Sequence, residues 1–473
     1  MPISFRTIVG FALLMLVMLA ISPLFAVDDA APSLADEATS WLQGYLRIDT
    51  TNPPGNEARA AAYLAQILHS EGVATRLLVT PDGRTNLYAR LAATEPESDT
   101  LILLHHMDVV AAGDGWTHDP LSAELSKGKI WGRGAIDAKS LGIAHLAAFI
   151  NTKRSNRPRK RELIFLAVAD EESGGQEGAR WLLEEHAALI SNNVAGVLNE
   201  GGSNRVISER LLWWGIEVAQ KRPLWVRATA HGRGGHGSAY NPGSATHRLL
   251  VGLAEFVLEE PESRVTVETR QYFAAIAPFH SQGFRDVFGA EDLQTVQDRF
   301  RVALAGGSSR PVLMPGMMAF FQDTIQITSV QGSSETVNVV SEEASALIDI
   351  RLLPDTKTDD VLDRLRETLG RGVSVDVLLR SPITPSSSTE TPIFEALRRT
   401  LGSEAPVIPA LITGTTDSRY FRERGIPAYG FSPFVLSGEE ARGIHGPNES
   451  IPLAKFTQGL ATMIRVVEAC TAL

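Results

Sequence analysis

The chain has 473 residues, with 44 Lys and Arg against 55 Asp and Glu, which gives a net charge of −11. This length suggests two or three domains, and 44% hydrophobic against 21% charged residues excludes a disordered or collagen-like chain. The acidic balance argues against a nucleic-acid partner, because non-specific binding of that kind requires a basic surface. The single cysteine, Cys470, excludes an internal disulfide and a Cys-based zinc site. Any metal must therefore be held by histidine and carboxylate side chains.

The N-terminus carries an uninterrupted apolar run over Ile8–Val27, and Arg6 is the only charged residue before Asp28. A short basic start, an apolar middle and a small residue at the exit, here Ala26, are typical of a secretory signal peptide. We predict a signal over residues 1–26 and an exported chain, periplasmic or secreted. The run is also long enough to span a bilayer, so an uncleaved membrane anchor that leaves the body outside the cytoplasm is the alternative.

The following segment alternates helical spacing with short apolar strands. Helices are predicted over 36–66, broken by a turn at 51–55, and over 138–150 and 181–189; strands are predicted over 101–104, 163–169 and 194–198. Strands that alternate with helices indicate a parallel or mixed sheet covered on both faces. We assign residues 33–221 to the first part of an α/β catalytic domain.

From about Pro223 the pattern changes. Residues 224–230 and 344–352 alternate apolar and polar side chains, as half-exposed antiparallel strands do. The stretch at 261–315 between them shows weak strand signals and no repeat. The α/β character returns after Pro354. We therefore predict an inserted α+β domain over 222–353 and a second part of the catalytic domain over 354–473.

Polar residues with metal-binding or acid–base chemistry follow the ends of the predicted strands, where ligand sites form in open α/β sheets. They are His105, His106 and Asp108 after the first strand, Glu171 and Glu172 after the second, Glu200 after the third, Asp137 in a glycine-rich turn, and His445 near the C-terminus. Each signal alone is weak, because a single histidine is more often structural, a Glu pair is more often solvated, and Gly132–Gly134 could be only a turn. Together they suit Zn²⁺, and also Co²⁺ or Mn²⁺, and a two-metal site would need one shared carboxylate.

These motifs, in this order, resemble the zinc-dependent metallopeptidases and amidohydrolases that include aminoacylase, acetylornithine deacetylase, succinyl-diaminopimelate desuccinylase, glutamate carboxypeptidase and carboxypeptidase S. The resemblance runs from about residue 35 to the C-terminus. It rests on five segments: 106–110 (His-Met-Asp-Val-Val), 132–137 (Gly-Arg-Gly-Ala-Ile-Asp), 171–172 (Glu-Glu), 200–201 (Glu-Gly) and 445–449 (His-Gly-Pro-Asn-Glu). The chain departs from the family pattern at Ala111, Ser140 and Asn199, where Pro, Gly and Asp are usual.

The resemblance implies a role for each site residue. Asp137 would bridge two zinc ions, Glu172 and His445 would complete one site, and His106 and Glu200 would complete the other. Asp108 would hydrogen-bond His106 and fix its tautomer. Glu171 would be the general base, taking a proton from the metal-bridging water and passing it to the leaving nitrogen. His105, His118 and His145 are expected to be structural.

The inserted domain also resembles the lid of that family. His236, in the segment 232–238, matches a lid histidine that stabilises the oxyanion, often in the partner subunit's site, which implies a homodimer. Asn338 matches a lid asparagine, and Arg351 matches an arginine that binds the substrate carboxylate. Gly414 and Thr415 match a loop that lines the same carboxylate pocket with backbone amides.

The resemblance implies hydrolysis of a peptide or amide bond next to a free carboxylate. Export favours a carboxypeptidase or dipeptidase acting on small peptides, and an N-acyl amino acid amidohydrolase is the alternative. A related aminopeptidase fold recognises a free amine, and the lid with His236 and Arg351 argues against it. A non-catalytic binding homologue is a further alternative, although every ligand position and Glu171 carry the expected residue type.

Overall fold

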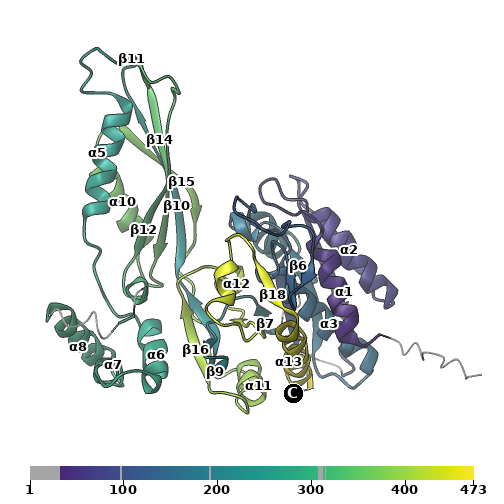
Figure 1. The fold of residues 1–473 in the computed structure, drawn as a ribbon. Coiled ribbons are helices and arrows are strands. Elements are labelled where there is room, and N and C mark those ends of the chain that lie inside the picture. Colours follow the sequence, from purple (N-terminus) through teal and green to yellow (C-terminus); the bar gives the residue numbers. More distant parts are fainter. Residues whose placement is uncertain (1–31, 96–98, 191–192, 307–312, 315, 473) are drawn as a thin grey trace, which may run out of the picture.

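The computed structural model describes residues 32–95, 99–190, 193–306, 313–314 and 316–472, so the predicted signal over 1–26 lies outside the described residues. Within these ranges no helix is both long enough and apolar enough to cross a membrane. Figure 1 shows two units side by side: a larger one built on a wide sheet and an elongated one that stands beside it.

A nine-stranded mixed sheet forms the centre of the larger unit. In spatial order its strands are β1 (Thr75–Val79), β2 (Thr85–Leu91), β6 (Glu162–Val168), β3 (Thr100–His106), β7 (Val194–Asn199), β17 (Ala428–Gly430), β9 (Arg210–Gln220) and β16 (Val407–Ile412), with β8 (Arg205–Ile207) paired to β9. β3 runs parallel to β6 and β7, and β17 runs parallel to β7. The three predicted apolar strands are therefore confirmed as β3, β6 and β7, and their carboxyl ends meet at one edge.

Helices cover both faces of this sheet because each central strand is apolar on both sides. Leu101 and Leu103 of β3 join one buried cluster, whereas Ile102 and Leu104 join the other. The first cluster lies under α1 (Leu34–Leu46), α2 (Glu57–Ser70), α3 (Lys139–Ser155), α11 (Pro392–Leu401) and α13 (Leu453–Ala472), and the second under α4 (Trp181–Glu185) and α12 (Ser418–Glu423). The predicted helices near 36–66, 138–150 and 181–189 are confirmed.

The elongated unit is a four-stranded antiparallel sheet with two helices on one face (Figure 1). Its strands, in spatial order, are β12 (Thr324–Gly332), β14 (Glu343–Leu352), β10 (Arg222–His231) and β15 (Val373–Arg380), and its helices are α5 (Ala245–Leu258) and α10 (Thr358–Leu369). Alternate residues of β14, including Ala346, Ile348 and Ile350, pack in the core beneath these helices. This unit is the predicted α+β insertion, and the chain returns to the large sheet at β16.

The boundary predicted at residue 353 is corrected by the position of β15. This strand pairs with β10, and α10 packs against α5, so the inserted unit extends to Arg380. In the sequence, an amphipathic helix followed by a strand is compatible with either the larger or the elongated unit. Only the pairing of β15 with a strand more than 140 residues earlier, seen at Ala230 and Val373, assigns it to the smaller sheet.

The segment over 261–315, to which no secondary structure was assigned from sequence, contains three helices in its described part. It forms α6 (Val267–Ile276), α7 (Gln282–Phe288) and α8 (Leu293–Ala305), capped by Thr266, Ser281 and Asp292. Its aromatic core belongs to the same cluster as the helices of the large sheet, and α6 packs against β16. Along the chain, this segment lies between elements of the elongated unit. Its helices nevertheless pack against the larger unit.

Candidate metal centre

Five side chains from separate segments of the chain meet at the carboxyl edge of the large sheet. His106 ends β3, Glu172 lies in a 3-10 turn after β6, and Glu200 follows β7. Asp137 and His445 come from two loops joined by a small sheet of β4 (Leu125–Ser126), β5 (Lys129–Trp131) and β18 (Ser450–Pro452). Because β5 pairs with β18, the loop before β18 lies beside the turn after β5. The fold thus brings all five predicted ligands together.

The two oxygens of Asp137 face different imidazoles. Oδ1 lies 3.1 Å from Nε2 of His106, and Oδ2 lies 3.2 Å from Nε2 of His445. Glu200 Oε2 is 3.5 Å from the same nitrogen of His106, and Glu172 Oε2 is 3.3 Å from that of His445. These distances define two half-sites that share one carboxylate, which is the arrangement of a bridging ligand.

The residues present fit a bound metal. The donor atoms of His106, Asp137 and Glu172 lie within 4.8 Å of one another, as do those of His106, Glu171 and Glu200. In the described part of the chain, Glu172 Oε1 is buried without a hydrogen-bond partner. A buried polar atom of this kind is costly unless something satisfies it. Imidazole and carboxylate donors without thiolate suit Zn²⁺, Co²⁺ or Mn²⁺.

The electrostatics of the site also favour a cation. Burial raises the pKa of Glu200 to about 7, although His106 opposes the shift. Hydrogen bonds from His106 and His445 overcome the effect of burial and lower the pKa of Asp137. Burial first, and then the nearby Glu200, raises the pKa of Glu171 well above its usual value. Several carboxylates therefore share a poorly solvated space, which a bound cation would neutralise.

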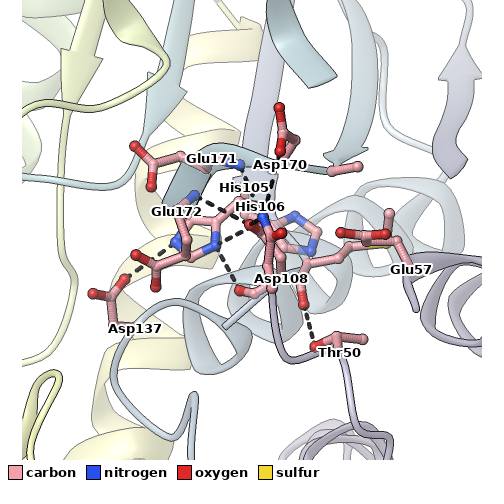
Figure 2. A network of polar contacts seen from close by, with 12 residues as sticks. Thr50, Glu57, His105, His106, Asp108, Asp137, Asp170, Glu171 and Glu172 are labelled. Carbon is pink, nitrogen blue, oxygen red and sulfur yellow. Dashed lines mark hydrogen bonds and ion pairs between the residues drawn. The ribbon is translucent and has the colours of Figure 1, made fainter. Parts of the chain in front are cut away.

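Asp108 holds the turn that carries Glu171 and Glu172 (Figure 2). Its carboxylate accepts hydrogen bonds from the backbone N–H of Glu171 and of Glu172, both at 3.1 Å. The closest partner of His106 Nδ1 is the main-chain carbonyl of Asp108 at 2.9 Å, and the carboxylate lies 3.6 Å away. Both contacts favour a proton on Nδ1, which leaves Nε2 free as a ligand atom.

Sequence reasoning missed the residues whose hydrogen bonds hold Asp108 and Asp170, next to the turn of Glu171 and Glu172. Asn52 donates to Asp108 Oδ2 at 2.8 Å. Asp170 accepts from Arg84 Nη1 at 3.0 Å, and Arg84 Nε donates to Glu57 at 2.9 Å. Asn52 and Arg84 lie in loops 56 and 86 residues from their respective partners Asp108 and Asp170, and no local pattern distinguishes them.

Glu449 is a second residue whose role the sequence did not reveal. Its buried carboxylate accepts from the backbone N–H of Gly134 at 3.0 Å, of Ile136 at 2.7 Å and of Asp137 at 3.0 Å. Gly134 has φ +87°, and a Cβ there would lie 2.9 Å from Val109, so the turn requires glycine. In sequence, Glu449 is recognised only as part of the His445 motif. In the structure, its hydrogen bonds hold the turn that carries Asp137.

The predicted lid residues His236 and Asn338 lie together but apart from the metal ligands. β11 (Gly235–His236) pairs with β13 (Val339–Val340), and the Asn338 carbonyl accepts from Gly237 N–H at 2.8 Å. Figure 1 places β11 at the tip of the elongated unit, far from the large sheet. Both side chains are exposed. Within one chain, therefore, neither side chain reaches the metal centre.

The predicted carboxylate-binding residues are held by neighbouring side chains. Arg351 forms two hydrogen bonds with Asp349, at 2.7 and 2.9 Å. Thr415 Oγ1 accepts from Arg419 at 2.8 Å, and Arg419 also donates to Gly174 O at 2.7 Å, which ties this loop to the turn after Glu172. Gly414 is exposed in the same loop. The loop at 414–415 therefore lies beside the site, whereas Arg351 already has an acidic partner.

Asp417 is a further acidic group of this region that sequence reasoning did not single out. It is buried, and neither of its oxygens has a hydrogen-bond partner among the described residues. Burial, opposed by Arg419, raises its pKa to about 8.

The three histidines predicted to be structural lie away from the metal ligands or pack against other side chains. His105 points to the face of β3 opposite His106, where it packs against Phe165. His118 stacks on Trp131 with ring centroids 4.0 Å apart, and His145 is buried within α3.

Histidine and carboxylate ligands at the carboxyl edge of a mixed sheet, beside an inserted α+β unit, define a metal-dependent hydrolase. Residues 102–469 match the peptidase family M20/M25/M40, and the chain belongs to this family. The chain is 26% identical to aminoacylase-1B of Rattus norvegicus over 451 residues, which covers 93% of this chain and 96% of the relative.

Two solved structures share the fold. A metallo-carboxypeptidase of the M20 family from Sulfolobus solfataricus superposes with a TM-score of 0.67 at 19% identity, covering 93% of this chain and 100% of that structure. Human carnosine dipeptidase 1 superposes with a TM-score of 0.64 at 16% identity, covering 93% and 97%.

Proposed function

We propose that this protein hydrolyses an amide bond next to a free carboxylate, in a small peptide or an N-acyl amino acid, with two zinc ions held by the five ligands. The observation that carries the proposal is the position of Asp137, whose two oxygens face His106 and His445 at 3.1 and 3.2 Å. Glu200 would complete the half-site of His106, and Glu172 that of His445. The names of the relatives, which include an aminoacylase, a carboxypeptidase and a dipeptidase, support this substrate range.

Glu171 is the proposed general base. When bound, the metal pair supplies a Lewis acid for the carbonyl group and lowers the pKa of water. The Glu171 carboxylate takes the proton of the attacking water as the carbon–oxygen bond forms, and gives it to the leaving nitrogen as the carbon–nitrogen bond breaks. The backbone bond to Asp108 at 3.1 Å fixes the turn from which Glu171 acts. The loop at Gly414 and Thr415 is the proposed site of the substrate carboxylate, with Arg351 available after it releases Asp349.

Removal of metal is expected to abolish hydrolysis. The test uses residues 27–473, a pool of dipeptides and N-acyl amino acids, and a measurement of bound metal before and after chelation. We expect two metal ions per chain, loss of cleavage with the chelator, and recovery when zinc is added back. Cleavage that persists in the chelated protein would contradict the proposed mechanism, and recovery only with cobalt or manganese would correct the choice of zinc.

We also propose a homodimer in which His236 of the partner subunit completes each site. The support is that His236 and Asn338 are exposed at the tip of the elongated unit, away from the ligands of their own chain. We expect His236→Ala and Glu171→Gln to be nearly inactive alone. A 1:1 mixture should regain about one quarter of wild-type activity, because half the dimers are mixed and each mixed dimer has one intact site. A mixture no more active than its components, or a monomer in solution, would overturn this assignment.

The chain is further proposed to be exported, on the evidence of the apolar run over Ile8–Val27. Expression of the full chain with fractionation of the cells should place it in the periplasm or the medium. Its intact mass should correspond to a start near residue 27. A full-length mass in the membrane fraction would indicate the uncleaved anchor instead, and a cytoplasmic chain would contradict export altogether.

A further inference from the structure

Three charged side chains lie buried beside the turn that carries Glu171 and Glu172. The Arg84 guanidinium sits between two carboxylates: Nε donates to Glu57 at 2.9 Å, and Nη1 donates to Asp170 at 3.0 Å. Nη2 also pairs with Glu57. The exposed fraction of the side chain is 13% for Arg84, 1% for Glu57 and 9% for Asp170, so water solvates these charges poorly. They therefore depend on one another, although none of them is a proposed metal ligand or substrate contact.

Asp170 lies between β6 and Glu171, and its backbone conformation is unusual. Its φ is +70°, in the left-handed region that few residues other than glycine adopt. Its carbonyl accepts from the N–H of Ser173 at 3.2 Å and of Gly175 at 2.5 Å, and its Oδ2 accepts from the N–H of Glu177 at 3.1 Å. Such a conformation persists only where its surroundings hold it. The conformation of Asp170 sets the direction in which the chain continues into Glu171.

Arg84 holds Asp170 from outside the turn. Oδ1 of Asp170 accepts from Arg84 at 3.0 Å and from Asn52 at 3.4 Å. The guanidinium is fixed in turn, because Glu57 binds two of its nitrogens and the chain at Gly55 passes close to it. A Cβ at Gly55, where φ is +76°, would lie 2.6 Å from Nη2. A planar guanidinium can span two carboxylates in one geometry, whereas a lysine ammonium is a single charge on a flexible chain.

We infer that Arg84 is a positioning residue for the proposed general base: held by Glu57, it fixes Asp170 and thereby orients Glu171. The inference rests on the proposed function. Figure 2 shows the Asp170 side chain pointing away from that of Glu171, so Arg84 acts through the backbone of the turn and not by touching the reacting atoms. Asp108 separately binds the N–H of Glu171 and of the ligand Glu172. Loss of Arg84 should therefore slow the chemical step while the metal stays bound.

Arg84→Lys tests this role, because lysine keeps the positive charge but cannot bridge Glu57 and Asp170 in the same geometry. We expect kcat to fall by about 10–100-fold, the usual cost of losing a group that orients an active residue. KM and metal content should stay at the wild-type values. Arg90→Lys is the matched control, because Arg90 forms an ion pair with Glu162 on the neighbouring strand β2, and its kcat should not change.

A double variant shows whether the effect passes through Glu171. In Glu171→Gln there is no base left to orient, so adding Arg84→Lys should slow turnover no further. A general loosening of the fold would instead multiply the two losses. Multiplied losses, or wild-type kcat in folded Arg84→Lys, would overturn the inference.

Glu57→Gln is the second variant, to be used if Arg84→Lys does not fold. The amide keeps the shape of the side chain and weakens its hold on the guanidinium, so kcat should fall by a smaller factor at unchanged KM. Wild-type kcat in this variant would overturn the inference while leaving the proposed function intact. Metal-loaded wild-type protein that cleaves no substrate of the pool would refute the proposed function itself, and this inference with it.

Discussion

Replacing Glu171 with glutamine is expected to lower kcat by about 10²–10⁴-fold, the contribution of a general base. The amide keeps the size and the backbone bond to Asp108 but cannot accept the proton of the attacking water. The measurement is kcat on the best substrate of the pool, together with the metal content of the variant.

Metal content separates two roles for Glu171, because its carboxylate also lies within reach of His106 and Glu200. A variant that keeps two metal ions and loses turnover supports a base. Loss of metal from the variant would indicate that Glu171 is a metal ligand. Near-normal turnover would refute the mechanism. Glu184→Gln, on the exposed side of α4, is the matched control and should behave as wild type.

The apolar strands and the ligand motifs were predictable because their signals are local. β3, β6 and β7 are short apolar runs: β3 ends at His106, Glu200 directly follows β7, and Glu172 lies in the turn after β6. Parallel pairing then requires those ends to lie at one edge, so His106 and Glu200 come together without any knowledge of the loops. Around Asp137, Glu200 lies near His106 and Glu172 lies near His445, and their roles as metal ligands stay a prediction.

The supporting contacts were not predictable, because they join residues distant in the sequence. The Glu449 carboxylate binds the turn at Asp137 from 312 residues away, and Asn52 reaches Asp108 across 56. A polar residue in a loop has the same local pattern whether it is solvated or anchors a ligand turn. The ion pair of Arg351 with Asp349 is different, since residues two apart on a strand share a face, and this pairing could have been anticipated.

The same limit explains the misplaced boundary of the inserted unit, but it does not explain the helices that were not predicted. β15 and α10 have the alternation and amphipathic spacing of either unit, and only pairing across the chain assigns them. The helices over 267–305 begin at Thr266, Ser281 and Asp292, whose side chains accept backbone bonds at their N-termini. Such caps are visible in sequence, so a search for helix starts would have predicted these helices.

Replacing Asp137 with asparagine is expected to weaken both half-sites with one change. Its two oxygens serve both half-sites, at 3.1 Å from His106 and 3.2 Å from His445. An amide offers one oxygen and no charge, so at most one half-site keeps its oxygen ligand and both lose the shared negative charge. Because loss of a group that merely supports a ligand costs about 10–100-fold in affinity or activity, loss of the shared ligand should exceed about 100-fold.

The measurement is bound metal per chain alongside turnover at increasing zinc concentration. Asp137→Asn should retain fewer than two ions, and excess zinc should restore part of its activity, because the defect is one of binding. Glu171→Gln should show the opposite behaviour, with full metal content and no response to zinc. Asp114→Asn, the same change at an exposed loop position, is the control. Two tightly bound ions with normal turnover in Asp137→Asn would show that Asp137 does not bridge the metals. That result would also contradict the division of the site into two half-sites.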